Sequence, residues 1–523
     1  MTDAIASEAA RRRTFAIISH PDAGKTTLTE KLLLYSGAIV EAGAVRARAG
    51  VQRDVSSDWM ELERQRGISI SSTVLRFEHD GVLFNLLDTP GHRDFSEDTY
   101  RVVSAVDAAV IVLDAAKGVE SQTLKLFQVA QARGIPLITF INKVDRFGMA
   151  PLELIDDIER QLRMAATPVT WPVGNGTDFE GVVDRRDGSF WQFERTARGA
   201  HIGAEEQTTL EAIAGSPHRH EAEQELAVLA GVGADHDRER FLSGVSTPVF
   251  FGSALWNFGV RLLLDAIAEM APTPTPQIER DGRARSLDAP LAGFIFKIQA
   301  NLDTRHRDRI AFMRVCSGRF ERGGALINHR TGRSTTTKYA HQMFGRERDT
   351  VDIAYPGDIV GLVNASDLTI GDSLSIDGKA QFRTLPTFAP EHFRLARNLD
   401  TSRYKQFRRG IAQLDDEGVI QALHTRDRGE REPILGAVGE MQFEVAVFRL
   451  EAEFGAKVRL DPVPYRLARR TNEAGRAAAS AQRGVEVAER RDGTLLALFP
   501  SENMLNVTRR DHPDIVLDSI IGL

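Results

Sequence analysis

The sequence predicts an α/β protein with a doubly wound, mostly parallel sheet, followed by an antiparallel β-barrel and an α+β unit. Three observations support this fold class. In the first half, short apolar runs alternate with helical patterns. From about residue 291, glycine turns separate short strands, and after about residue 390 strand and helix patterns mix. We therefore expect domains at 1–276, 277–390 and 391–523.

The first unit is predicted from five strand-length runs that are apolar on both faces, as parallel strands covered by helices are. Leu124, Phe127 and Ala130 show the helical spacing between two of these runs. A polar interval, about 177–244, is predicted to be an insertion with a hairpin and a helix. Prolines at positions 272, 274 and 276 mark the end of the unit, because proline cannot continue a helix. The five runs are Phe15–Ile18, Leu83–Leu87, Ala108–Leu113, Leu137–Ile141 and Val249–Phe251.

The two later units are predicted from shorter signals. Apolar or alternating segments between glycines indicate the barrel, and the third unit combines strand-like runs with one helical face at spacings of four and three. The predicted elements are strands at Gly293–Ile298, Ile310–Val315, Val419–Leu423, Ile434–Val438 and Ala456–Leu460, and a helix through Met441, Val445 and Phe448.

Composition excludes several classes of protein. The net charge of −7 argues against a generally basic nucleic-acid coat, so any RNA contact must come from local patches. The single cysteine, Cys316, allows no disulfide within the chain and is expected to be buried and inert, which fits a reducing cytoplasm. The longest apolar run, Ala108–Leu113, is far shorter than the roughly 20 residues that span a bilayer. We expect a cytoplasmic protein without a membrane partner.

The strongest local motif is a phosphate-binding loop. It follows a predicted strand and precedes a helical stretch, which is the context that such a loop requires. Its backbone N–H groups would cradle phosphates, Lys25 would reach the β- and γ-phosphates, and Thr26 would ligate Mg²⁺. The alternative is a chance glycine-lysine helix start. The loop residues are Ser19, His20, Pro21, Asp22, Ala23, Gly24, Lys25 and Thr26.

A second motif, Asp88-Thr89-Pro90-Gly91-His92, directly follows another predicted strand. Asp88 would hold Mg²⁺, and Gly91 can bring its N–H close to a γ-phosphate because glycine tolerates close approach. Loss of that phosphate would release the loop, which is the basis of a switch. His92 would orient the attacking water, so the predicted catalytic residues are His92 and Lys25. A plain Pro-Gly turn is the alternative.

Two further motifs follow the fourth and fifth strands and would select the base. In Asn142-Lys143-Val144-Asp145, the Asp145 carboxylate can accept hydrogen bonds from guanine N1 and N2, a pair of donors that adenine lacks. The backbone of Ser253-Ala254-Leu255 could donate to guanine O6. All four motifs end strands of one sheet in the required order, and the carboxyl ends of such strands are where doubly wound sheets bind ligands. GTP or GDP is therefore the expected ligand, and an ATPase is disfavoured.

The segment between the first two motifs supplies one more expected ligand. Ser69, within Arg66–Ile70, offers a hydroxyl that would complete the Mg²⁺ shell in the GTP state. The predicted metal ligands are thus Thr26, Ser69 and Asp88. The charged stretch before it, Asp58–Arg66, is typical of a mobile surface loop.

These motifs resemble the five guanine-nucleotide motifs of the translational GTPases, a branch of the P-loop GTPases. Within that branch the chain resembles the bacterial peptide chain release factor 3 family, in the phosphate loop and in three further strings. Unlike many members of the branch, it has serine rather than threonine at Ser69, and Pro21 where elongation factor Tu has an aliphatic residue. The three strings are Asp58-Trp59-Met60-Glu61, Phe296-Lys297-Ile298-Gln299-Ala300-Asn301 and His306-Arg307-Asp308-Arg309.

The resemblance implies a ribosome-stimulated GTPase that acts in translation termination. In its GTP form it would release class-one release factors from the ribosome, contacting ribosomal RNA and proteins, and then hydrolyse GTP and leave. It implies no tRNA-like domains beyond the third unit, and we expect a monomer. The alternatives are an elongation factor G-like or ribosome-protection GTPase, and a nucleotide-dependent assembly protein that hydrolyses little. Arg305, Arg307 and Arg309 would contact RNA phosphates or form a solvated turn.

Overall fold

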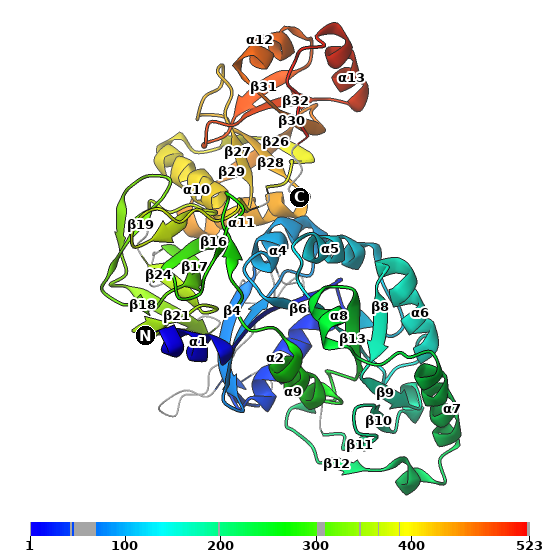
Figure 1. Ribbon diagram of the computed structural model, residues 1–523. Coiled ribbons are helices and arrows are strands. Elements are labelled where there is room, and N and C mark those ends of the chain that lie inside the picture. The colour runs from blue at the N-terminus through cyan, green and yellow to red at the C-terminus, as the bar shows by residue number, and fades with distance from the viewer. Residues whose placement is uncertain are drawn as a thin grey trace.

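The computed structural model describes residues 2–41, 44–45, 70–196, 199–300, 309–344, 347–363, 366–385 and 387–519. Figure 1 shows three units in chain order: an α/β unit, an antiparallel β unit beside it, and a C-terminal unit whose last part extends away from the other two. The predicted order of fold types is confirmed.

The first unit is built on a seven-stranded sheet with the order β4-β5-β1-β6-β7-β13-β8. The pairs are parallel except for β4 with β5, which is antiparallel. The predicted mostly parallel sheet is therefore confirmed, and all five predicted runs lie in it. The strands are β1 (Arg12–Ser19), β4 (Thr73–His79), β5 (Val82–Asp88), β6 (Ala108–Asp114), β7 (Leu137–Asn142), β8 (Ala165–Pro168) and β13 (Ser246–Phe251).

Helices cover both faces of this sheet, because successive strand residues point to opposite sides. Phe15 and Ile17 share a core with α2 and α9, whereas Ala16 and Ile18 share a second core with α4, α5 and α6. The helices are α1 (Thr2–Ala10), α2 (Lys25–Tyr35), the short η1 (Arg93–Phe95), α4 (Ser96–Val103), α5 (Ser121–Ala132), α6 (Pro151–Leu162) and α9 (Val260–Met270), and a small hairpin joins β2 (Ile39–Glu41) and β3 (Ala44–Val45).

A second, antiparallel sheet of order β12-β11-β10-β9 interrupts the unit before β13. This second sheet begins at Thr170, whereas the sequence placed the start of the insertion near 177. The difference arises because β9 is apolar and therefore resembles a strand of the main sheet. The predicted hairpin near Asp187–Gly188 joins β10 and β11. The elements are β9 (Thr170–Val173), η2 (Gly176–Asp178), β10 (Gly181–Asp184), β11 (Phe190–Phe193), β12 (Glu205–Thr208), η4 (Leu210–Ile213), α7 (Pro217–Gly231) and α8 (Arg238–Leu242).

The second unit is a curled antiparallel sheet of order β20-β19-β25-β16-β17-β24-β21-β22. Cys316 is buried in it, and burial raises the pKa of the thiol to about 12, so the expected inert cysteine is confirmed as buried. The strands are β14 (Gln277–Ile278), β15 (Ala284–Arg285), β16 (Ala292–Ala300), β17 (Arg309–Ser317), β18 (Phe320–Glu321), β19 (Ala325–Asn328), β20 (Ser334–Thr336), β21 (Ala340–Phe344), β22 (Glu347–Thr350), β23 (Ile353–Ala354), β24 (Ile359–Val363) and β25 (Ser373–Ser375).

The C-terminal unit contains two small sheets, of orders β27-β28-β26-β29 and β30-β32-β31. The second sheet lies in the last part of the chain, where the sequence analysis predicted no elements. The two outer strands, β30 and β31, are short and contain charged residues, whereas the central strand β32 is a continuous apolar run that the sequence analysis missed. The elements are β26 (His392–Asn398), η5 (Thr401–Arg403), α10 (Tyr404–Glu417), β27 (Gln421–Leu423), β28 (Ile434–Ala437), α11 (Met441–Phe454), β29 (Val458–Pro462), β30 (Leu467–Thr471), α12 (Glu473–Ala481), β31 (Glu486–Glu489), β32 (Leu495–Phe499) and α13 (Glu502–Asp511).

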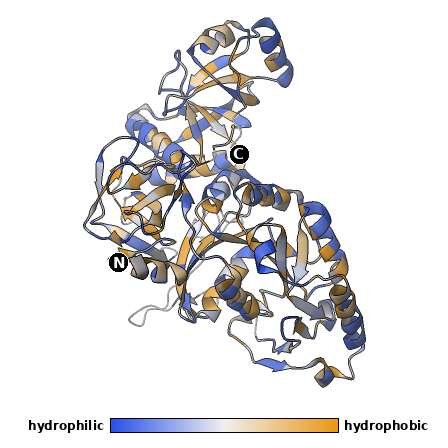
Figure 2. Cartoon of the chain, viewed as in Figure 1, coloured by the Kyte–Doolittle hydropathy of each residue, from blue (hydrophilic) through white to orange (hydrophobic). Residues whose placement is uncertain are grey.

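Figure 2 shows hydrophobic residues concentrated on the sheet strands and hydrophilic residues on the outward faces of the helices. Buried polar contacts join the first two units: Arg314 Nη2 lies 2.6 Å from Asp107 Oδ2, and Arg12 Nε lies 2.8 Å from Asp358 Oδ2. Paired buried charges of this kind hold a fixed geometry, because separating them leaves an uncompensated charge. Among the described helices, none combines the length and apolar character needed to cross a membrane.

Candidate functional site

The loops that follow β1, β5, β7 and β13 meet at one edge of the main sheet, because these strands lie close together and run in the same direction. Between the loops lies a cavity of about 350 Å³, which we call the strand-end cavity. This is within the usual size of ligand pockets. It is lined by Ser19, His20, Pro21, Asp22, Gly24, Lys25, Thr26, Thr27, Gly91, His92, Asn142, Lys143, Asp145, Arg146 and Leu255.

The remaining predicted nucleotide residues lie behind the wall of this cavity. All of them are buried, and Thr89 Oγ1, for example, donates a hydrogen bond to Ile17 O at 2.7 Å. They shape the loops, and among them Asp88 also contacts Lys25 of the lining. They are Ala23, Asp88, Thr89, Pro90, Val144, Ser253 and Ala254. Ser69, the third predicted metal ligand, lies outside the described residues.

The phosphate-binding loop has the backbone that its motif predicts. Asp22 and Gly24 both have positive φ, at 64° and 94°, and α2 begins directly afterwards at Lys25. A Cβ at Gly24 would overlap the side-chain amide of Asn142, so this position requires glycine. The helix N-terminus supplies unpaired N–H groups and the positive end of the helix dipole, which suit an anion.

Asn142 connects three of the four loops. Its Nδ2 donates to Ala23 O at 2.7 Å, and its Oδ1 accepts from the N–H groups of Lys143 and Ala254 at 2.9 and 2.8 Å. The side chain is buried, so these bonds fix the relative positions of the loops. The N–H of Ala254 is thus engaged with Asn142, and the predicted contact of the last loop with guanine O6 stays a prediction. Ser253 N–H is engaged as well, with Phe258 O at 2.9 Å.

Asp145 presents one satisfied and one unsatisfied oxygen. Its Oδ2 accepts a hydrogen bond from Trp256 Nε1 at 3.0 Å, whereas Oδ1 is buried and has no partner within the described residues. Buried polar atoms are rarely left unpaired, so a missing donor is expected at this position. Lys143 braces the same loop, since its Nζ donates to Asp114 Oδ2 at 2.7 Å.

Lys25 and Asp88 form a buried pair, with Nζ 2.6 Å from Oδ1. Thr26 and Asp88 offer hydroxyl and carboxylate oxygens, the hard ligands that Mg²⁺ prefers. The donor set therefore fits the predicted metal. In the Lys25–Asp88 pair, the Asp88 carboxylate also supplies the negative charge that holds the Lys25 side chain at the cavity.

The His92 side chain is about one-quarter exposed, at 26%. Its Nδ1 lies 3.2 Å from the backbone nitrogen of Asp94 and 3.5 Å from the Asp94 carboxylate, so Asp94 holds the ring in place. The preceding residue is held as well, because Gln122 Nε2 donates to Gly91 O at 2.9 Å. These bonds restrict the loop that carries the histidine.

His20 has a neighbour that sequence spacing did not reveal. Its Nδ1 contacts the Glu120 carboxylate, and its Nε2 is buried with no partner among the described residues. Burial lowers the pKa of His20, and the charge of Glu120 opposes that shift. Other residues that the sequence analysis missed are Thr27, Asp114, Gln122, Arg146 and Trp256. Thr27, Arg146 and Trp256 directly adjoin predicted motifs, and this adjacency was the one available signal.

The loops next to the cavity also contact both other units, at a place we call the three-unit junction. Ile70, Phe95 and Val445 form one buried apolar cluster, although they come from different parts of the chain. Asp94 Oδ2 accepts the N–H of Met441, the first residue of α11, at 2.9 Å. From the second unit, Lys297 Nζ donates to Ser72 Oγ at 2.6 Å.

Family comparisons cover most of the chain in three parts. Residues 10–273 match the elongation factor Tu GTP binding domain, residues 290–377 match elongation factor G domain 2, and residues 382–509 match the C-terminal domain of class II release factor RF3. The third match falls on the part of the chain where the sequence-based prediction was least detailed.

Curated relatives are similar along nearly the whole length. Peptide chain release factor 3 of Gloeobacter violaceus is 50% identical over 89% of this chain and 88% of its own length. The protein of the same name from Synechocystis sp. is 47% identical over 99% of this chain and 96% of its own. Among solved structures, the crystal structure of ttk003000868 from Thermus thermophilus has a TM-score of 0.69 at 24% identity, covering 88% of this chain and 69% of that one, and supports the fold alone.

Proposed function

The chain belongs to the peptide chain release factor 3 family, and from this premise we propose that its GTP form releases class-one release factors from the ribosome. It is a translation-termination GTPase that binds guanine nucleotide. After release it would hydrolyse GTP and leave the ribosome. The observation that carries this proposal is similarity to a named release factor over 99% of this chain and 96% of the relative.

The strand-end cavity is the proposed nucleotide site. The phosphates would lie on the backbone of the loop before α2, with Lys25 exchanging its contact with Asp88 for the terminal phosphates. The unsatisfied Asp145 Oδ1 would accept a guanine N–H, and Trp256 would hold the carboxylate in place through Oδ2. Of the fourth loop, Leu255 lines the cavity and is the proposed neighbour of guanine O6.

Thr26, Asp88 and Ser69 are the proposed Mg²⁺ ligands. The ion would neutralise charge on the β- and γ-phosphates. The chain's own contribution is to exclude water, align the phosphates and present His92. His92 would hydrogen-bond the attacking water and orient it, and slow intrinsic hydrolysis would become fast when the ribosome fixes the loop.

The three-unit junction is the proposed route from nucleotide to ribosome. Ile70 directly follows the predicted metal ligand Ser69, and Phe95 lies three residues after His92, so both loops that should respond to the γ-phosphate meet Val445 of the C-terminal unit. Ordering these loops would change how the unit docks. A preference of a few kcal/mol between two docked forms is sufficient to redirect such an equilibrium.

The test is a reconstituted termination reaction. Ribosomes are stalled after peptide release with a fluorescent class-one factor bound, and dissociation of that factor is followed with GTP, GDP or a non-hydrolysable GTP analogue. We expect GTP to accelerate dissociation, and the analogue to release the factor while retaining this protein on the ribosome. No acceleration would reject the proposal. A translocation assay on the same ribosomes separates it from the elongation factor G-like alternative.

Three further proposals accompany this function. The ribosome, through its RNA and proteins, and the class-one factors are the proposed partners. The protein would act in the cytoplasm, where translation takes place, and as a monomer.

A further inference from the structure

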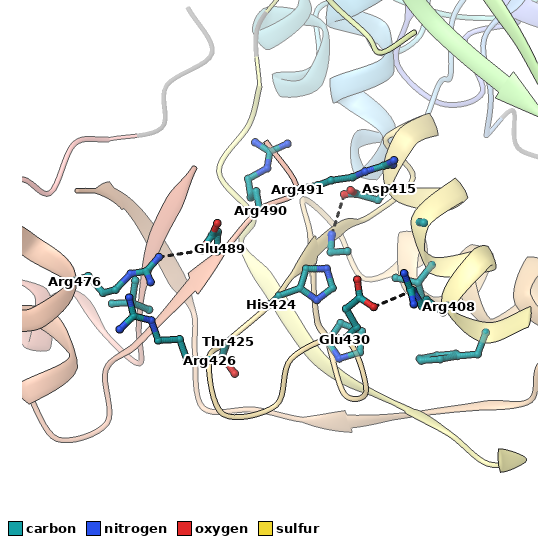
Figure 3. Close-up of a pocket in the computed structure, with 16 residues that line it drawn as sticks. Arg408, Asp415, His424, Thr425, Arg426, Glu430, Arg476, Glu489, Arg490 and Arg491 are labelled. Atoms are coloured by element: carbon teal, nitrogen blue, oxygen red, sulfur yellow. Dashed lines mark hydrogen bonds and ion pairs between the residues drawn. The ribbon is translucent and has the colours of Figure 1, made fainter. Parts of the chain in front are cut away.

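A second cavity, of about 480 Å³, lies in the C-terminal unit, and none of the predicted nucleotide-site residues lines it (Figure 3). It is formed at the seam between the two small sheets, by α10, the loop after β27, α12 and the end of β31. We call it the arginine cleft, after the residues Arg408, Arg426, Arg476, Arg490 and Arg491 that line it. In Figure 3 these side chains enter from different elements on several sides of the space.

The seam itself is fixed by backbone hydrogen bonds. His424 N–H donates to Glu489 O at 2.9 Å, and Glu489 N–H donates to His424 O at 2.7 Å. This bridge joins the two sheets at one wall of the cleft. The cleft is therefore part of the folded unit, and a ligand would not have to order it.

Most of the charges in the lining are paired. Five guanidinium groups line the cleft with three carboxylates, which belong to Asp415, Glu430 and Glu489. Arg408 Nε lies 2.9 Å from Glu430, and Arg476 Nη2 lies 3.0 Å from Glu489. Arg426 and Arg491 pair with carboxylates just outside the lining, those of Glu473 and Asp416. Arg490 is therefore the guanidinium of the lining without an ion pair among the described residues, and it is the group that would attract an anion.

Several donors in the cleft have no acceptor within the described residues. The Nε of Arg476 and the hydroxyl of Thr425 are buried and unpaired, and Thr425 is only 6% exposed. No described ion pair or hydrogen bond engages the guanidinium of half-buried Arg490. Because buried polar atoms are seldom left without partners, these donors indicate a ligand rich in hydrogen-bond acceptors.

The third carboxylate of the lining belongs to Asp415. It is half-buried and accepts the N–H of Ala422 at 2.9 Å. Burial raises the pKa of Asp415 to about 6, which weakens its negative charge under mildly acidic conditions.

The other wall of the cleft is apolar. Phe407, Ile411, Pro433 and Val487 contribute to the lining. A bare phosphate would leave most of 480 Å³ unfilled, whereas a nucleotide carries both a phosphate for the arginines and a flat base for this wall. Arginine is the side chain best suited to phosphate, and it also stacks on bases.

We propose that the arginine cleft binds a nucleotide of single-stranded RNA, with the phosphate held by Arg490 and Arg476 and the base against the apolar wall at half-buried Val487. The site is separate from the strand-end cavity and needs no GTP hydrolysis. Only the choice of ribosomal RNA as its natural source rests on the proposed function. The proposal also gives a local place for RNA contact on a chain with a net charge of −7. Arg309, one of three arginines considered for this role in the sequence, instead pairs with Asp416 at 2.9 Å.

The test measures a fluorescent, short single-stranded RNA binding to the full-length protein, with the strand-end cavity saturated with GDP. Arg490→Ala should weaken RNA binding about tenfold, the value of one charge-assisted hydrogen-bonded contact. It should also reduce the slope of log affinity against log salt by about 1, as loss of one phosphate contact does. Thr425→Val, which keeps the shape and removes the hydroxyl, should weaken binding less.

Arg510→Ala is the matched control, because Arg510 lies on α13 of the same unit, is 75% exposed and pairs with Asp511. It should leave RNA affinity unchanged, and equal losses in both variants would mean non-specific attraction and overturn the proposal. Undetectable RNA binding, or unchanged binding after Arg490→Ala, would also overturn it.

Adenosine monophosphate is tested in parallel: if it alone binds the cleft, the ligand is a free nucleotide and the RNA proposal is wrong. Since none of these measurements requires ribosomes, they remain informative if the termination assay fails.

Discussion

The strand-end cavity and the three-unit junction share residues of the same loops but are assembled in different ways. The cavity is built from short segments, each joined directly to a strand of one sheet. The junction is built from pairs that are very far apart in the chain, such as Asp94 with Met441, separated by 347 residues. One place is set by local motifs, and the other by how three units dock.

The difference shows how chemistry and its control can be separated. The residues proposed to contact nucleotide are held within the first unit, so nucleotide binding should tolerate changes elsewhere. His92 connects the two places, since its Nδ1 is held by the N–H of Asp94 while the carboxylate of Asp94 holds α11. Changes at the junction should therefore affect hydrolysis more than binding.

The largest effect is expected from His92→Ala. Ribosome-stimulated hydrolysis should fall about 10²–10⁴-fold, because the group that orients the water is lost. GTP affinity should stay unchanged. Single-turnover phosphate release with saturating ribosomes measures the effect. His79→Ala, on β4 and paired with Asp265 at 2.9 Å, serves as the control. If the His92 variant retains normal turnover, that residue has no part in the mechanism.

Asp145→Asn should have the next largest effect, and on binding rather than on hydrolysis. The affinity for GDP should fall about 10²-fold, because a charged acceptor facing two guanine donors is replaced by an amide. Xanthosine diphosphate, which presents an acceptor at the corresponding position, should bind better than before. Competition titrations measure both. Asp156→Asn, at an exposed position on α6, should change neither, and preserved guanine selectivity in the Asp145 variant would contradict the assignment.

Gly439→Ala tests the junction without altering the cavity. A Cβ at Gly439 would overlap the carboxyl group of Asp94 and push the start of α11 away from it. Stimulated hydrolysis should fall about tenfold, since a small displacement of a positioned group is costly, while GDP affinity stays constant.

Gly436→Ala is the matched control, because its Cβ would meet Pro390 at 2.8 Å in the same unit but not Asp94. A second arm combines Gly439→Ala with His92→Ala. If the junction acts through His92, the two losses should not add. Additive losses, or equal losses in both glycine variants, would indicate general damage to the unit.

The smallest expected effect concerns stability near the arginine cleft. The pKa of Asp415 is about 6 in the folded protein, above its ordinary unfolded value of about 3.9. Between these values the folded state binds more protons, so this group's contribution to stability is full below about pH 4 and is lost as the pH rises through 6. Asp415→Asn should therefore stabilise the protein at pH 7 by about 1–2 kcal/mol and have little effect at pH 4.

Thermal unfolding at both pH values measures this difference. The amide can still accept the N–H of Ala422, so the local structure should persist. Asp416→Asn is the contrasting neighbour, because Asp416 pairs with Arg309 and Arg491, and its loss should destabilise. A pH-independent effect of Asp415→Asn would contradict the raised pKa.

The sequence alone determined the fold type of each unit and the positions of the loops at the sheet edge. Apolar runs such as Ala108–Leu113 favour burial on both faces, and several of them alternating with helical patterns are typical of a parallel sheet covered by helices. Residues at their ends, such as Ser19 and Asp88, then meet at one edge for reasons of topology. The second small sheet of the C-terminal unit was not predicted: its outer strands β30 and β31 contain charged residues, and the apolar run of β32, Leu495–Phe499, was missed.

Only the tertiary structure decided which side chains hold the site together. No local pattern links Asn142 to Ala23 and Ala254, Trp256 to Asp145, or Asp94 to Met441, because each contact depends on how separate segments dock. The arginine cleft likewise exists because two sheets meet, and its arginines look like ordinary surface charges in the sequence. Short-range order follows from the spacing of apolar residues, whereas long-range contacts are set by packing of the whole chain.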